Sequence, residues 1–132
     1  MNAPLLIAAA TLFSIGTMHT VLAEWRGDRR LVRRIVQSTL FDTGDAQDVL
    51  ARQVVRLAWH LTSLAWCGIA AVLATFAFAE QTWVVVATSR ILSAVFFFHA
   101  ALSLMLARGR HPSWYLFLIV SALAFLGTVS GG

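Results

Sequence analysis

Histidine is the residue type through which this chain is best equipped for chemistry. Four are present, and each lies within or at the edge of a long apolar stretch: His19, His60, His99 and His111. An imidazole can ligate haem iron or a transition metal, carry a proton, or hydrogen-bond a neighbouring helix. Because ionisable groups inside a membrane are costly and tend to face the interior of a helix bundle, we expect these side chains to point inward.

Three of the histidines are candidates for one shared site. His19 and His60 fall at matched depth on antiparallel neighbouring helices, as a bis-imidazole haem b or a shared transition metal requires, and His99 lies one turn deeper. Glu24 and His111 are candidates for a second, shallower layer of metal ligands, although Glu24 lies about 140° around its helix from His19. Two alternatives stay open: each histidine hydrogen-bonds a Ser or Thr of a neighbouring helix, or the cluster handles protons or a substrate.

The sequence contains no catalytic motif. It has no Ser–His–Asp arrangement, phosphate-binding glycine loop, CxxC or HExxH, and it therefore favours a non-catalytic protein over an enzyme. The single cysteine, Cys67, lies inside an apolar stretch, where we expect it to pack as a small apolar side chain.

Composition predicts the elements that must position these residues. Of the 132 residues, 59% are hydrophobic and 12% are charged, about half the charge of a soluble domain, which excludes a water-soluble enzyme, a disordered chain and a disulfide scaffold. Four stretches lack Asp, Glu, Lys and Arg, and each is close to the roughly 20 residues that cross a bilayer. We therefore predict one all-α domain (1–132), a bundle of four transmembrane helices at about 4–24, 56–79, 83–107 and 112–130. The helical pattern of the second continues back to Asp45.

The segment 25–55 is the one sizeable part of the chain outside these stretches. Its arginine pairs alternate with apolar pairs, a pattern typical of a helix lying in the headgroup region over anionic lipid. The alternative is a solvated positive loop that only fixes orientation. The candidate lipid-binding residues are Arg29, Arg30, Arg33 and Arg34.

Arginine distribution predicts the orientation. All ten basic residues are Arg, and nine of them fall in 25–56 and 108–111, on one side of the predicted spans. The positive-inside rule places these segments in the cytoplasm and both termini outside. The formal net charge of +4 thus comes from arginines that set the membrane orientation, and it gives no indication of nucleic-acid binding. Arg90, inside the third span, either extends to the outer headgroups, pairs with Glu80 across the turn, or pairs with an anionic partner outside.

Three segments carry a resemblance to known proteins. His19 to Glu24, Trp59-His60-Leu61-Thr62, and Gly109-Arg110-His111-Pro112 with Trp114 look like segments of small four-span bacterial inner-membrane proteins of uncharacterised function. The resemblance implies a multi-pass protein of the bacterial inner membrane and no particular reaction. We expect an accessory or assembly subunit, alone as a homo-oligomer or in a larger membrane complex, whose cytoplasmic-side histidine cluster binds haem or metal. The alternative is a small redox or transport protein with that cluster as its working centre.

Overall fold

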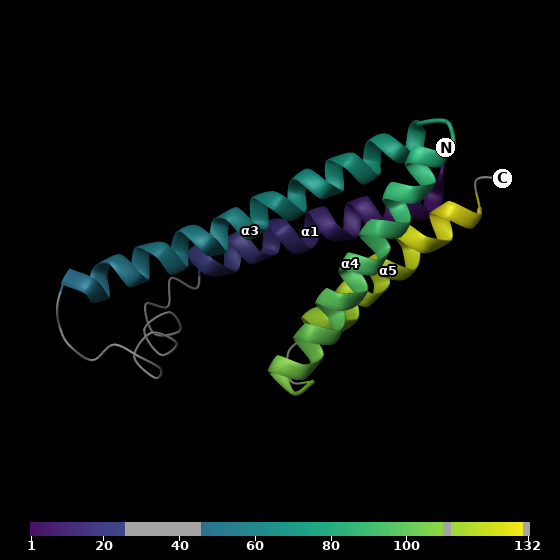
Figure 1. Cartoon of the computed structure of the whole chain (residues 1–132). Helices are drawn as coiled ribbons and strands as arrows, with labels where there is room; N and C mark the ends of the chain where they lie inside the picture. Colours follow the sequence, from purple (N-terminus) through teal and green to yellow (C-terminus); the bar gives the residue numbers. More distant parts are fainter. Residues whose placement is uncertain (26–45, 110–111, 131–132) are drawn as a thin grey trace.

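A computed structural model describes residues 1–25, 46–109 and 112–130, and these form four α-helices and no strand (Figure 1). The predicted all-helical class is confirmed. The helices are α1 (Ala3–Trp25), α3 (Ala46–Phe78), α4 (Trp83–Ala107) and α5 (Ser113–Val129). The interfacial helix and the four lipid-binding arginines predicted in 25–55 fall mostly in 26–45, outside the described residues.

Three helices are long and apolar enough to cross a membrane: Ala3–Val21 in α1, Gln53–Phe78 in α3 and Trp83–Met105 in α4. α5 contains no charged residue, but its 17 residues extend about 25 Å, slightly less than a hydrocarbon core of about 30 Å. α3 begins ten residues before the predicted second span, as the helical pattern from Asp45 indicated, and its 33 residues extend about 50 Å.

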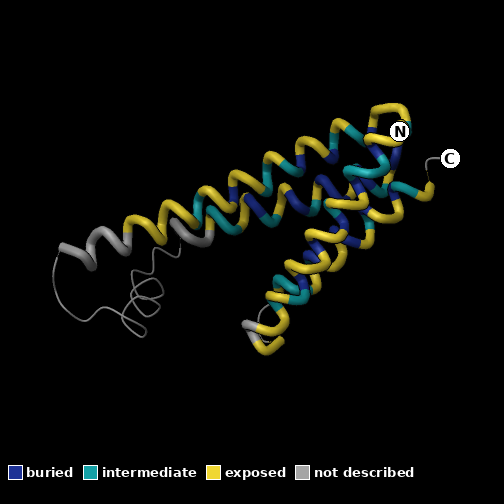
Figure 2. Tube along the Cα trace, viewed as in Figure 1, coloured by how far each residue is buried: buried dark blue, intermediate teal, exposed yellow. Residues whose placement is uncertain are grey.

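The helices are arranged as two antiparallel pairs. α1 packs along α3, α4 packs along α5, and α1 also contacts α5, so that α1 and α5 are central. The pairs meet at the end that carries both chain termini and the 79–82 turn, and they diverge toward the arginine-bearing ends (Figure 1). The buried core follows this arrangement, since fully buried side chains come from all four helices: Leu5, Leu12, Leu73, Phe96 and Val120 (Figure 2).

Asn2 fixes the end where the pairs meet. Its side-chain oxygen accepts from the Leu5 backbone N–H (3.3 Å), which makes it the N-cap of α1. Its backbone N–H donates to the carbonyl of Ala77 in α3 (2.7 Å), and its side-chain amide donates to the carbonyl of Gly127 in α5 (2.6 Å). One residue therefore joins the beginning of α1 to the ends of two other helices.

Candidate functional site

His19 lies at the contact between α1 and α3. Its Nδ1 is 2.7 Å from the Ser63 hydroxyl, and that hydroxyl donates its single hydrogen to the carbonyl of Trp59 (3.1 Å). A His19 Nδ1 that carries a hydrogen satisfies both contacts, since it donates to Ser63 while the Ser63 hydroxyl donates to Trp59. In return, the Trp59 indole N–H donates to the backbone carbonyl of His19 (3.0 Å).

Two tryptophans of α3 enclose the same imidazole. The Trp59 ring stacks on it, with centroids 3.9 Å apart and planes 3° from parallel, and the Trp66 ring meets it edge-on at 4.9 Å. We refer to His19, Trp59, Ser63 and Trp66 as the His19 cluster. Within it the histidine joins two helices through hydrogen bonds and ring packing, as expected for a polar interhelical contact in a membrane.

Gly16 allows the close helix approach that the His19 cluster needs. A Cβ at this position would lie 2.9 Å from the Cys67 Sγ, which is closer than Cβ atoms pack, and 3.1 Å from the Ser63 carbonyl oxygen, which is tighter than most Cβ contacts. Gly16, one turn before His19, therefore leaves the space in which α1 and α3 pack closely. Cys67 packs against Gly16 as a small side chain, as expected, and is half-buried.

His99 lies in a different environment on α4. Its side chain is exposed, and its Nδ1 is 3.3 Å from the Val95 carbonyl one turn earlier. A donating Nδ1 leaves Nε2 as the basic nitrogen, and Nε2 has no hydrogen-bond partner among the described residues. The His99 ring also contacts the rings of Phe96 (6.1 Å between centroids) and Phe117 (5.4 Å).

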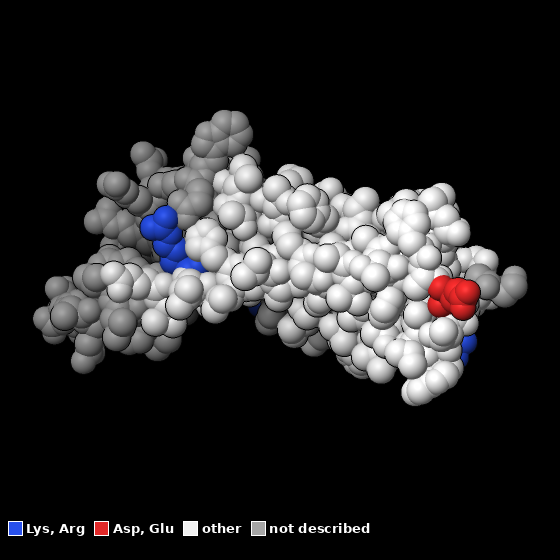
Figure 3. Space-filling model, turned by 90° about the horizontal axis from the view of Figure 1, so that it is seen from above, with Lys and Arg blue, Asp and Glu red and all other residues white. Residues whose placement is uncertain are grey.

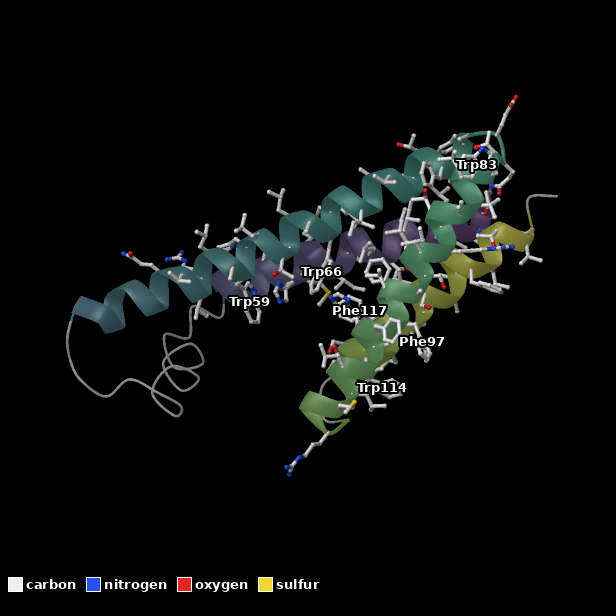
Figure 4. All side chains as sticks on the ribbon, in the orientation of Figure 1. Trp59, Trp66, Trp83, Phe97, Trp114 and Phe117 are labelled. Atoms are coloured by element: carbon white, nitrogen blue, oxygen red, sulfur yellow. The ribbon has the colours of Figure 1, made fainter. Side chains whose placement is uncertain are left out.

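A chain of aromatic rings separates the two histidines. Phe117 of α5 contacts His99 on one side and Trp66 of α3, at 5.0 Å, on the other (Figure 4). His19 and His99 are thus connected through two intervening rings, Trp66 and Phe117. The depth estimates along each helix could not anticipate this separation, because it follows from the divergence of the two helix pairs.

His60, His111 and Glu24 are the remaining candidate ligands. Within the described part of the chain, no group of three or more His, Cys, Asp or Glu side chains could hold a metal ion. His60 is half-buried on α3 beside Trp59. His111 and the side chain of Glu24 lie outside the described residues, so the predicted second layer does too.

Arg90 is the one basic side chain located well inside α4, and it extends along the helix pair. Its Nε lies 3.5 Å from the Thr128 hydroxyl, in the last turn of α5. It forms no ion pair with Glu80 among the described residues, so the predicted pair with Glu80 is wrong, and the side chain extends toward the end of the molecule that carries the 79–82 turn. The described charged side chains visible in Figure 3 lie mainly near the two ends of the molecule.

Two contributors to this arrangement were missed at the level of sequence. Asn2 precedes a proline-containing apolar helix, and the preference of asparagine for the N-cap was the signal that could have found it. Trp66 lies in mid-span and carries no polar neighbour in sequence, so nothing marked it as a partner of His19. The chain matches no protein-family model, no curated protein and no solved structure. The resemblance to four-span inner-membrane proteins stays a prediction.

Proposed function

We propose that this chain is a small four-span protein of the bacterial inner membrane that acts as an accessory or assembly subunit of a larger membrane complex. Both termini lie outside, and the arginines of 25–55 contact anionic lipid on the cytoplasmic side. In this proposal the protein is non-catalytic, and the His19 cluster holds its helices together. The face of α3 directed away from α1 supports the proposal.

That face carries residues suited to contact with another membrane helix. Its exposed side chains follow one another at spacings of four and three residues, the repeat of a helix-packing seam: Leu61, Ala65, Gly68, Val72 and Thr75. We refer to these five residues as the outer α3 seam. Small residues at its centre would let a second backbone approach closely, which is the main way membrane helices associate.

Gly68 is the observation that carries this argument. Gly16 and Gly127 both lie where a Cβ would collide with a neighbouring helix, whereas a Cβ at Gly68 would meet nothing within 4 Å. Glycine weakens a helix relative to alanine by about 1 kcal/mol. Two helix glycines thus serve contacts within the chain, and the third is explained by a contact with a helix of another protein.

Gly68→Leu tests the proposal. The wild-type protein should comigrate with a larger complex after extraction in a mild detergent, and the Gly68→Leu variant should migrate as a smaller species, because the leucine fills the space a partner backbone needs. Ala94→Leu, at an exposed small residue of α4 outside the seam, is the matched control and should behave as wild type. A monodisperse wild-type monomer would contradict the proposal, and a complex containing only this chain would identify a homo-oligomer.

A second candidate function rests on His99. In haem and metal sites, the ligating histidine usually donates its other ring N–H to a carbonyl or carboxylate, which orients the ring, and the His99 Nδ1 beside the Val95 carbonyl fits this pattern. On this reading the protein is a small redox or transport protein that holds haem b or a transition metal at His99. Purified protein should then show a Soret band or stoichiometric metal that His99→Ala removes, and a colourless, metal-free preparation would exclude it.

A further inference from the structure

The Arg90 side chain extends along α5 toward the first turn of α4. The hydrogen bonds between Ser93 and Ser121 place residue 128 of α5 about level with residue 86 of the antiparallel α4, one turn before Arg90. Side chains on a helix tilt toward its N-terminus, and the Arg90 Nε accordingly lies 3.5 Å from the Thr128 hydroxyl in the last turn of α5. The guanidinium therefore lies near the outer end of this helix pair, where the first residue of α4, Trp83, is 81% exposed.

The guanidinium of Arg90 is oriented by a single contact with the protein. The Thr128 hydroxyl donates its own hydrogen to the Phe125 carbonyl (2.8 Å), so its oxygen accepts from the Arg90 Nε. The two terminal nitrogens of the guanidinium have no partner among the described residues, and the side chain is exposed. Thr128 thus holds the guanidinium while its planar pair of amino groups stays available for an anion.

A phosphate is the anion that suits this arrangement. An arginine within a membrane span needs a counter-charge, and Glu80 does not provide it. Guanidinium groups bind phosphate through two parallel hydrogen bonds. A helix shorter than the hydrocarbon core also draws the headgroups inward, which brings lipid phosphates toward the end of α5.

We propose that Arg90, held by Thr128 at the end of α5, binds the phosphate of one outer-leaflet phospholipid. The inference rests on the membrane-spanning arrangement of the proposed function and is independent of its subunit role. The binding chemistry is that of any phosphate anion, and the membrane is the source that the position of Arg90 favours.

Lipid retention tests the assignment. Protein reconstituted with phosphatidylethanolamine, which has a phosphate but no net charge and so is not the anionic lipid proposed for the arginines of 25–55, should keep one phospholipid per chain through purification in an uncharged detergent, as measured by native mass spectrometry. Arg90→Gln should retain that lipid at least about tenfold less, since a charge-assisted pair is worth more than about 1.4 kcal/mol. Arg56→Gln removes the same charge from the opposite end of the molecule and should retain lipid as the wild type does.

The source of the phosphate is resolved by competition. Inorganic phosphate at millimolar concentration should leave the retained lipid in place, and a lipid without phosphate, such as a galactosyl diacylglycerol, should not be retained. Displacement by inorganic phosphate would assign the site to a free anion and overturn the lipid assignment. Equal retention by the wild type and by a helical, monodisperse Arg90→Gln variant would overturn the site.

Failure of this inference and failure of the proposed function give different results. If the wild-type protein is extracted from vesicles by alkaline carbonate, it does not span the bilayer, and both are overturned. If it resists extraction while Arg90→Gln retains lipid normally, only the phosphate site is overturned.

Discussion

Ser89 and Ser93 lie one turn apart on α4 and contribute to stability in opposite directions. Ser93 and Ser121 of α5 exchange hydroxyl-to-carbonyl hydrogen bonds of 2.9 and 2.8 Å, whereas the Ser89 hydroxyl, on a residue 1% exposed, has no partner among the described residues. Ser93→Ala should lower the free energy of unfolding by about 1 kcal/mol. Ser89→Ala removes a buried unpaired hydroxyl and should be neutral or stabilising. Thermal unfolding of both variants in detergent measures the difference, and equal destabilisation would contradict it.

His19 combines two kinds of contact that can be separated by substitution. His19→Phe keeps an aromatic ring against Trp59 but removes the hydrogen bond to Ser63. His19→Asn keeps a nitrogen donor near the position of Nδ1 but removes the ring. Each should destabilise the protein by about 1 kcal/mol, and His19→Ala by about the sum of the two. The measurement is thermal unfolding, and full stability of His19→Ala would show that the His19 cluster does not hold α1 to α3.

At the scale of the elements, the contribution of Asn2 as the N-cap of α1 can be tested separately from its other hydrogen bond. Asn2→Ser keeps a capping oxygen and loses only the donor to the Gly127 carbonyl, while Asn2→Ala loses both. Asn2→Ala should therefore be less stable than Asn2→Ser by about 1 kcal/mol, the usual value of an N-cap. Unfolding midpoints in one detergent give the comparison. Equal midpoints would mean that the bond to Gly127 carries the whole contribution of Asn2.

The helices could be predicted from the sequence because a stretch of about 20 residues without charge is recognised from its own residues, whatever it packs against. The start of α3 ahead of its apolar span was predicted for the same reason, from its continuous helical pattern. Packing depends on several segments together. Gly16 and Gly127 decide where helices cross, and only their neighbours show that a Cβ does not fit there.

The candidate site was predicted less completely than the fold. His19 was expected to face a neighbouring helix, and hydrogen bonding to a Ser was one of the alternatives considered, which the contact with Ser63 bears out for this residue. The common site with His99 was not found in the described residues, because depth along a helix does not fix the distance between helices. The rings of Trp66 and Phe117 lie between them.

At the scale of the whole molecule, the question is whether α5 crosses the membrane as the three longer helices can. α5 is apolar throughout and packs along α4, and its last residue lies at the same end of the molecule as the 79–82 turn (Figure 1). A locally thinner bilayer accommodates a 17-residue span at modest cost. We therefore expect Ser130 and Glu80 to lie on the outer side, opposite Gln53.

Single cysteines in a Cys67→Ser background test this topology. A membrane-impermeant maleimide added to spheroplasts should label Glu80→Cys and Ser130→Cys at once, and Gln53→Cys only after permeabilisation. All three positions are exposed, so differences in labelling report the side of the membrane and not burial. Labelling of Ser130→Cys only after permeabilisation would mean that α5 re-enters the cytoplasmic side and that the chain crosses three times. The reverse pattern at all three positions would invert the orientation that the nine clustered arginines predict.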